Sequence, residues 1–155
     1  MLVTRLWLAD FRSYERLELD LSTGLTAIAG PNGVGKTNLL EAIGLLATLK
    51  SFRGAPVESL VRRGAAAAVV RAEGIRDDRD VLIELELTRG RTRAQVNRQR
   101  LRRARDLLGA LRVTVFAPDD LALVKGGPAL RRRYLDDLLV ARSPKFDSVR
   151  SDVDR

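Results

Sequence analysis

The eight residues from Gly30 to Thr37, GPNGVGKT, restrict the possible folds of this chain more than any other stretch. They follow the Walker A pattern, in which a glycine, four further residues and a second glycine precede a lysine and a serine or threonine. An apolar run at residues 24–30 predicts a buried strand before the loop, and apolar positions at helical spacing predict a helix over residues 36–49. A strand, a glycine-rich loop and a helix in this order predict a P-loop NTPase.

The residue types in this loop suit the binding of a nucleoside triphosphate. Glycines let the backbone turn its N–H groups toward phosphate oxygens, and the start of the helix adds its positive dipole end. Lys36 can reach the terminal phosphates, and the Thr37 hydroxyl can coordinate Mg²⁺. We therefore predict ATP and Mg²⁺ as cofactors, held by Gly30, Pro31, Asn32, Gly33, Val34, Gly35, Lys36 and Thr37. The alternative, a glycine-rich turn with an incidental lysine, is disfavoured by the flanking strand and helix.

Hydrolysis needs a second element, an acidic strand end called Walker B that helps to hold the metal and to align the attacking water. Glu84 ends the apolar run VLI, but the alternation continues beyond it, so we predict that Glu84 faces outward from a half-exposed strand. Asp119 and Asp120 follow the apolar run at residues 112–117, and we interpret them as caps of a short helix. Neither candidate supplies the acid, so we expect this chain to bind ATP without hydrolysing it.

The rest of the chain is typical of an α/β fold, because strand-like and helix-like patterns both occur along it. The predicted strands cover residues 2–9, 16–21, 65–74, 81–90 and 112–117, with a further hairpin arm at 91–100. The predicted helices cover residues 102–111, 118–124 and 129–143. These elements predict a mixed sheet that carries the Walker A loop and its helix, followed by the start of a helical part.

Arginine dominates the charge of this chain. Lysine and arginine total 28 against 20 acidic residues, which gives a net charge of +8. Such a chain attracts polyanions, and the guanidinium fork matches the geometry of phosphate groups. The densest cluster comprises Arg98, Arg100, Arg102, Arg103 and Arg105. We interpret it as a candidate contact for DNA phosphates, with an ordinary solvated surface as the alternative, because no aromatic residues for base stacking are interleaved.

The composition also excludes several kinds of site. Neither cysteine nor histidine is present, so disulfides, thiolate metal sites and the commonest general base are ruled out. No apolar run approaches the ~20 residues of a membrane-spanning helix, and the first residues lack the long apolar stretch of a secretion signal. We therefore expect a cytoplasmic location.

Four stretches together resemble the RecF family of bacterial recombination mediators, which is related to the ATPase heads of Rad50 and SMC proteins. They are LADFRSYERLEL at residues 8–19, GPNGVGKTNLLEAI at 30–43, SFRG at 51–54 and FAPDDLALVKGGPALRRRYLD at 116–136. The last of these distinguishes RecF from its relatives. The resemblance implies an ABC-type ATPase whose two copies close head to head over two ATP molecules. It also implies binding of gapped or single-stranded DNA, and action with RecR and RecO to help RecA onto single strands.

At the level of residues, the resemblance adds two implications to the Walker A assignment. In related heads the arginine of the FR element lies near the nucleotide, which makes Arg12 a further candidate for nucleotide binding. Residues 118–120 fall roughly where those heads place the Q-loop, but no glutamine stands there. A metal-sensing role for Asp119 or Asp120 is therefore left open.

RecF-like proteins run to more than twice this length, with the signature loop, Walker B and D-loop in their later half. The resemblance therefore implies that this chain is an amino-terminal portion, with residues 1–117 in the first lobe of the ATPase head and residues 118–155 beginning a helical second lobe. Two alternatives stay open. In the first, the chain is a Rad50- or SMC-like head fragment that tethers DNA. In the second, it is a nucleotide-binding module without turnover.

Overall fold

The computed structural model describes the whole chain except residues 118–119, 148 and 150–155. The chain divides into two compact units, Met1–Val113 and Thr114–Arg155. Among the described residues, no helix is both long enough and apolar enough to cross a membrane.

The first unit is built on a six-stranded sheet in the order β2-β1-β3-β4-β5-β6, in which all neighbouring strands are antiparallel. Its strands are β1 (Leu2–Phe11), β2 (Tyr14–Asp20), β3 (Ala67–Arg76), β4 (Arg79–Thr88), β5 (Arg91–Val96) and β6 (Gln99–Arg100). Short connections join most neighbours along the chain, so hairpins dominate the topology. The predicted strands at residues 2–9, 16–21, 65–74 and 81–90 and the hairpin arm at 91–100 are therefore confirmed.

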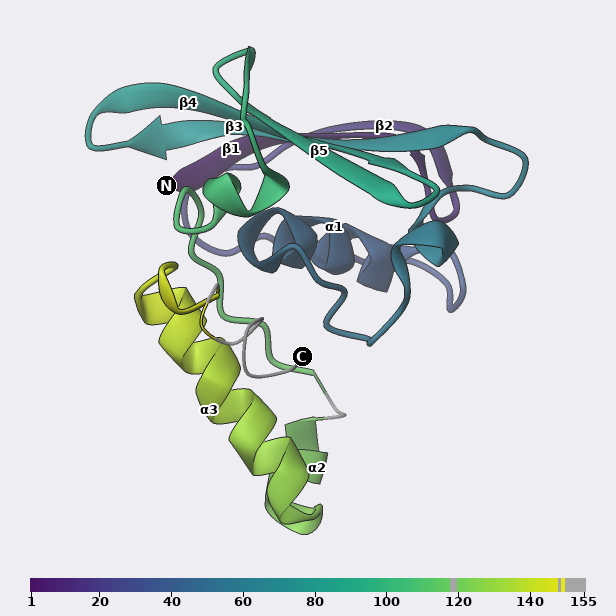
Figure 1. Cartoon of the computed structure of the whole chain (residues 1–155). Helices are drawn as coiled ribbons and strands as arrows, with labels where there is room; N and C mark the ends of the chain where they lie inside the picture. The colour runs from purple at the N-terminus through teal and green to yellow at the C-terminus, as the bar shows by residue number, and fades with distance from the viewer. Residues whose placement is uncertain (118–119, 148, 150–155) are drawn as a thin grey trace. The chain divides into compact units, whose positions relative to one another are not determined.

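One long helix, α1 (Lys36–Thr48), covers one face of this sheet, as Figure 1 shows. Alternation along each strand sends one set of apolar side chains toward α1 and leaves the other set on the solvent face. The shared core consists mainly of leucine, alanine and valine side chains, including Leu6, Leu8, Ala42, Leu45, Leu46, Val70, Ala72, Ile83 and Leu85, all at most 1% exposed. The helix starts at the residue after Gly35, so Lys36 and Thr37 of the Walker A motif lie in its first turn.

The buried strands predicted at residues 24–30 and 112–117 are wrong. Neither contains a strand, and large apolar side chains in them face solvent: Leu25 is 94% exposed and Phe116 is 87% exposed. A buried strand needs a neighbour that accepts and donates its backbone hydrogen bonds. The six described strands pair only with one another, apart from one isolated bridge between Phe11 and Val61, so neither segment has such a neighbour.

Two short 3₁₀ turns complete the first unit. The helix predicted at residues 102–111 is reduced to the single turn η2 (Ala104–Leu107), which is followed by Gly109 with a positive φ of 88°. A second turn, η1 (Val57–Leu60), was not predicted from the sequence pattern. Leu60 and Leu107 are both fully or almost fully buried, so each turn anchors one loop in the core.

The second unit contains the helices α2 (Leu121–Lys125) and α3 (Pro128–Arg142). Proline at the first position of α3 fits the start of a helix. The helix ends at Arg142 and is capped by Ser143, directly before Pro144, close to the end that the sequence predicts. The Arg131 guanidinium joins the two helices by donating hydrogen bonds to the carbonyl oxygens of Leu123, Val124 and Gly126, each at 3.3 Å.

Candidate nucleotide-binding site

The Walker A loop packs against the turn between β1 and β2, and glycine is required at the contact. Gly35, the residue that caps α1, has a φ of 111°, a conformation that side chains disfavour. A Cβ atom there would lie 2.7 Å from Ser13 Oγ and 3.1 Å from Tyr14 Oη. The end of the phosphate loop and the β1–β2 turn therefore touch directly.

The lysine of the motif lies over the loop. Its Nζ donates hydrogen bonds to the carbonyl oxygens of Gly30, at 2.7 Å, and Pro31, at 2.8 Å. The ammonium group is thus held at the loop itself, next to the first turn of α1, where Thr37 is exposed. One cation, a helix start and an exposed hydroxyl together form a donor set that fits a nucleoside triphosphate. Mg²⁺ fits as well, because it usually takes one or two protein ligands beside substrate phosphates.

A carboxylate buried on α1 connects this loop to the rest of the unit. Glu41 is 0% exposed. The guanidinium of Arg12 donates two hydrogen bonds to its carboxylate, from Nε to Oε2 at 2.8 Å and from Nη2 to Oε1 at 2.7 Å. The Ser51 hydroxyl donates a further hydrogen bond to Oε1, and the Arg53 guanidinium lies 3.8 Å from Oε2. We call these four residues the Glu41 cluster. Forked arginine–carboxylate pairing of this kind is strong and geometrically specific.

The pKa of Glu41 reflects this setting. Burial alone would raise the pKa of the carboxyl, since the charged form loses its water. The hydrogen bonds from Arg12 and Ser51, together with the charges of Arg12 and Arg53, outweigh burial and lower the pKa below its ordinary value. Glu41 is therefore ionised at neutral pH, and its charge is available to hold Arg12 in place.

Three further hydrogen bonds hold the β1–β2 turn in place. Arg12 has a φ of 54°, its backbone N–H donates to Leu60 O at 2.8 Å, and its Nη1 donates to Ser59 O at 3.0 Å. The next residue, Ser13, accepts a hydrogen bond from the side-chain amide of Asn38 at 3.0 Å. Helix α1 thus contacts the turn through Gly35, Asn38 and Glu41, one helical turn after another.

An open cavity of about 620 Å³ adjoins this contact. Its lining includes Arg12, Ser13, Asn38 and Arg53, and it continues along residues 58–65 to Arg89. Arginines outnumber acids in the lining, so the cavity favours an anionic or strongly polar occupant. It lies beside the first turns of α1, the helix that carries Lys36 and Thr37.

The structure therefore brings together most of the residues that the motif singled out, and it adds others. Residues 30–37 and the β1–β2 turn with Arg12 meet at the start of α1. Sequence reasoning missed Glu41, Ser51 and Arg53 as members of the site. A glutamate inside the apolar pattern of a helix next to a Walker A loop was the available signal, because a charge at a core position needs a partner.

Glu84 and Asp120, among the acidic candidates for Walker B, each have hydrogen-bond partners of their own. Glu84 faces the solvent side of the sheet, as predicted, where its carboxylate pairs with Arg71 at 2.6 Å and accepts a hydrogen bond from Gln95 at 3.1 Å. Asp120 Oδ2 accepts a hydrogen bond from the Ala117 N–H at 2.7 Å, just before α2, as a residue at a helix start does. Pro118 and Asp119 lie outside the described residues.

The arginine cluster proposed to contact DNA follows β5. Arg98 lies in the β5–β6 turn, Arg100 in β6, and Arg105 in η2. Arg102 and Arg103 lie between β6 and η2, and Arg103 pairs with Asp106 at 3.4 Å. All of these arginines are exposed except Arg105, which is half-buried, so the cluster is available to a ligand.

Comparison with known proteins places the chain in a family. The profile of the AAA domain matches residues 5–113. Curated relatives that match over 100% of this chain are named DNA replication and repair protein RecF. They include proteins from Streptomyces avermitilis, 55% identical, Nocardioides sp., 57% identical, and Kineococcus radiotolerans, 56% identical. The chain covers 42%, 37% and 40% of these relatives, respectively.

The chain belongs to the AAA domain family and matches the amino-terminal region of RecF. The resemblance stated from the four sequence stretches is thereby confirmed. The chain spans only about two fifths of the length of its RecF relatives, so the activity of the whole protein does not follow from the match alone.

Solved structures agree with this assignment. A structure of the recombination mediator protein RecF with ATP superposes with a TM-score of 0.86 at 30% identity, covering 97% of this chain and 42% of that one. A second RecF structure, described with ATPrS, has the same TM-score of 0.86 at 31% identity, covering 92% of this chain and 39% of that one. The SMC head domain from Thermotoga maritima has a TM-score of 0.58 at 24% identity over 69% of this chain, 41% of its own, and shares the fold. The predicted fold class, a P-loop ATPase fragment of the RecF and SMC head type, is therefore confirmed.

The Glu41 cluster predicts a specific pH dependence of stability. A folded-state pKa below the unfolded value contributes stability above about pH 4.3, and this contribution is lost as pH falls through the folded pKa. Glu41→Gln removes the charge that Arg12 needs, so we expect a loss of about 3 kcal/mol in the free energy of unfolding at pH 7. The loss should shrink as the pH is lowered toward 3 in urea unfolding series.

The matched control is Glu15→Gln, because the Glu15 side chain is 79% exposed and lies 3.6 Å from Arg62 on the surface. It should change stability little at any pH. Equal unfolding free energies for Glu41→Gln and Glu15→Gln at pH 7 would contradict the role given to the cluster.

Proposed function

We propose that this chain is the ATP-binding part of a RecF-like protein of DNA repair and recombination. The observation that carries the proposal is the Walker A loop itself, with the Lys36 ammonium held over Gly30 and Pro31 at the start of α1. A solved RecF structure described with ATP supports the same ligand. A triphosphate would take over the two hydrogen bonds that Lys36 now gives to loop carbonyls.

The rest of the nucleotide extends into the cavity beside α1. Arg12 and Arg53 supply cationic edges there, and Ser13 and Asn38 supply polar groups for a ribose or base. Arg12 contacts the nucleotide from this wall while Glu41 holds its guanidinium. The Thr37 hydroxyl would hold Mg²⁺ together with the phosphates, and the metal would neutralise part of their charge.

Binding without turnover is the form of activity proposed for this chain. The Glu84 carboxylate is paired with Arg71 on the solvent face of the sheet, opposite the face that packs on α1, so it does not serve the loop. The carboxylate of Asp120 is hydrogen-bonded to the backbone ahead of α2. Hydrolysis would need a separate carboxylate aligned on the attacking water.

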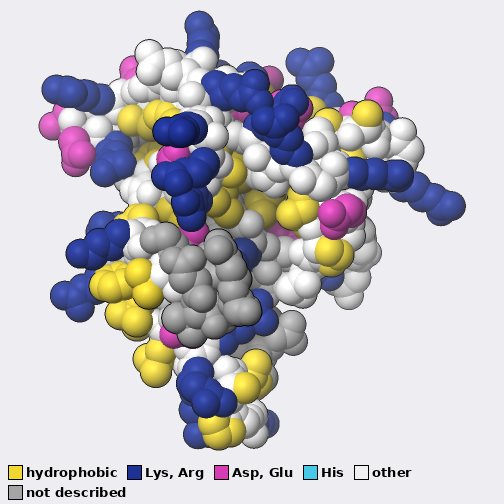
Figure 2. Space-filling model, viewed as in Figure 1, with side chains coloured by type: hydrophobic (Ala, Val, Ile, Leu, Met, Phe, Trp, Pro, Cys, Tyr) yellow, Lys and Arg dark blue, Asp and Glu magenta, His cyan; other side chains and the backbone are white. Residues whose placement is uncertain are grey.

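DNA binding and the partners are proposed from the RecF match and from charge. The net charge of +8 and the exposed arginines after β5 favour a nucleic acid partner, and basic side chains project at many points on the face in Figure 2. We propose gapped or single-stranded DNA as the ligand and the cytoplasm as the location. We further propose that the longer protein forms an ATP-dependent homodimer and acts with RecR and RecO to help load RecA.

A second function, a DNA-tethering head of the Rad50 or SMC kind, is supported by the shared fold with the SMC head domain. The RecF reading is favoured, because curated RecF relatives share 49–57% identity over the whole chain, whereas the SMC head shares 24%.

Removal of the Walker A lysine tests nucleotide binding. A charge-assisted contact of this kind is worth about 1.5–3 kcal/mol, so Lys36→Ala should weaken ATP binding roughly ten- to a hundred-fold by calorimetric titration. Lys125→Ala, a change of the same type in α2, should leave affinity unchanged. Thr37→Val should weaken binding chiefly when Mg²⁺ is present. Equal ATP affinity for the original chain and Lys36→Ala would refute the site.

The salt dependence of DNA binding tests the arginine cluster. Each phosphate contact on duplex DNA contributes about 0.9 to the slope of log affinity against log salt. Replacing Arg98, Arg100 and Arg102 by serine should therefore reduce the slope, measured by fluorescence anisotropy. Replacing Arg16, Arg76 and Arg79 removes the same charge from other surfaces and should reduce it less. Equal slopes for the two triple variants would assign the cluster to ordinary solvated surface.

A further inference from the structure

The cavity of about 620 Å³ beside α1 extends past the wall proposed to contact ATP. Its lining continues along residues 58–65 and reaches Arg89, which follows the end of β4. Among the described residues, this lining carries one acid, Glu58, and five arginines: Arg12, Arg53, Arg62, Arg63 and Arg89. A concave surface lined mainly by one sign of charge concentrates the electrostatic field and attracts ions of the opposite sign.

Three of these arginines are already paired within the fold. The Glu41 carboxylate accepts two hydrogen bonds from Arg12 and lies 3.8 Å from the Arg53 guanidinium. Arg62 Nε donates a hydrogen bond to Asp10 Oδ1 at 2.7 Å. Carboxylates of the protein therefore already bind these three guanidinium groups.

Arg63 and Arg89 differ, because their charges are not offset. Both residues are exposed, and no described residue forms a hydrogen bond or an ion pair with either guanidinium. An exposed arginine keeps its N–H donors available for an anion, and its planar fork matches the geometry of a phosphate group. The uncompensated positive charge of the cavity is thus concentrated at these two side chains.

The strand register brings the two arginines to the same end of the sheet. Arg63 lies just before β3, and Arg89 lies directly after β4. Ala67, the first residue of β3, pairs with Thr88, the last residue of β4. Between Arg63 and β3 the chain turns at Gly64, which has a φ of 90° and has no atom beyond its chain neighbours within 4 Å of a Cβ built on it. The surface beside Arg63 is therefore open to a ligand.

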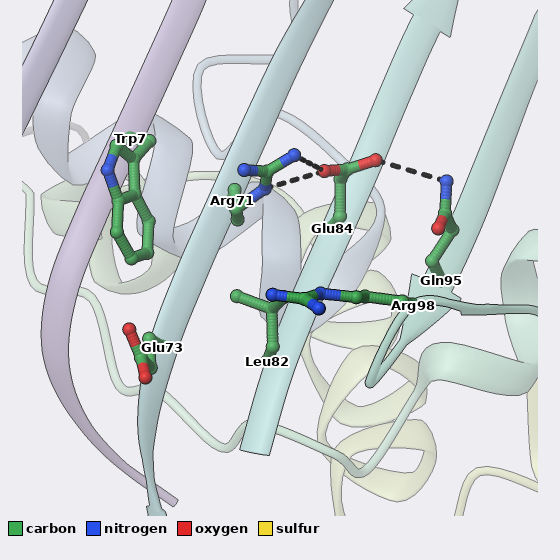
Figure 3. A pocket seen from close by; sticks show the side chains of 7 residues that line it. All are labelled: Trp7, Arg71, Glu73, Leu82, Glu84, Gln95 and Arg98. Carbon is green, nitrogen blue, oxygen red and sulfur yellow. Dashed lines mark hydrogen bonds and ion pairs between the residues drawn. The ribbon is translucent and has the colours of Figure 1, made fainter. Parts of the chain in front are cut away.

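A second hollow, on the face of the sheet opposite α1, has a different charge. It measures about 410 Å³, and its charged lining residues are two arginines and two glutamates: Arg71, Arg98, Glu73 and Glu84. Figure 3 shows the Glu84 carboxylate bound by Arg71, at 2.6 Å from Nε, and by Gln95, at 3.1 Å. Balanced charge gives little attraction for a polyanion, so the cavity beside α1 is the stronger candidate for one.

We propose that Arg63 and Arg89 bind the phosphates of a nucleic acid strand that runs along the outer part of the cavity beside α1. This inference rests on the proposed DNA binding of the chain and adds a contact to it. The turn that carries Arg98 is hydrogen-bonded to Leu82, near the start of β4, whereas Arg89 follows the end of that strand. The two basic surfaces therefore lie at opposite ends of β4.

The residue types in the cavity favour phosphates over other ligand groups. No aromatic side chain is among the described residues that line it, so the stacking surface on which bases bind is missing. The aromatic anchors typical of protein interfaces are missing from this lining for the same reason. Contacts to phosphates position a strand without reading its sequence, so we expect binding with little sequence preference.

The experiment measures binding of fluorescein-labelled oligothymidylate by fluorescence anisotropy over a series of salt concentrations. Each phosphate contact on a single strand contributes about 0.7 to the slope of log affinity against log salt, so Arg63→Gln with Arg89→Gln should lower the slope by about 1.4. Replacing both arginines by lysine keeps the charges and should retain most of the slope. Arg16→Gln with Arg79→Gln removes the same charge from exposed positions on β2 and β4 and should lower the slope less.

Calorimetric titration with MgATP separates this inference from the proposed nucleotide site, because the Arg63 and Arg89 double variant should bind MgATP like the original chain. Equal salt slopes for the two glutamine double variants would overturn the inference and leave ATP binding untouched. Failure of the original chain to bind oligothymidylate would overturn it together with the proposed DNA binding. An unchanged slope for oligothymidylate, with weaker binding of a labelled oligoglutamate peptide, would overturn it in favour of an acidic protein partner.

Discussion

The forked ion pair between Arg12 and Glu41 is the interaction on which the arrangement of this site depends. Glu41 lies within the apolar face of α1 and is fully buried, so its charge is tolerable only while Arg12 and Ser51 supply hydrogen bonds. Arg12 belongs to the turn between the first two strands. One buried carboxylate therefore joins the helix of the phosphate loop to the edge of the sheet and to the segment that follows the helix.

The end of the phosphate loop packs against the turn that this ion pair holds. The turn held by Glu41 also carries Ser13 and Tyr14, whose side chains leave no room for a Cβ atom at Gly35. The loop, the helix start and the β1–β2 turn thus form one packed unit, and the Lys36 ammonium lies within it. A nucleotide would bind to a surface that the antiparallel sheet has already organised, which lowers the entropy cost of binding.

Patterns among residues close in sequence predicted many of the strands and helices of this molecule. The predictions that failed depend on contacts between residues far apart in the chain. The Walker A spacing, α1 and the alternating strands all depend on near neighbours in sequence. The runs at residues 24–30 and 112–117 are just as apolar, yet apolarity predicts burial without specifying a partner strand, and the described strands offer none. Glu41 was missed for a related reason. Its partner Arg12 lies 29 positions earlier, and only the folded chain shows that the two meet.

ATP affinity in Glu41→Gln is the most direct test of the Arg12–Glu41 pair, because Glu41 is fully buried and can act on a nucleotide only through the turn and helix that it joins. The measurement is calorimetric titration with MgATP at pH 7, on samples shown to be folded by circular dichroism, beside Glu15→Gln. We expect an affinity about tenfold weaker for Glu41→Gln, equivalent to about 1.4 kcal/mol, and no change for Glu15→Gln. Folded Glu41→Gln that binds MgATP as tightly as the original chain would contradict it.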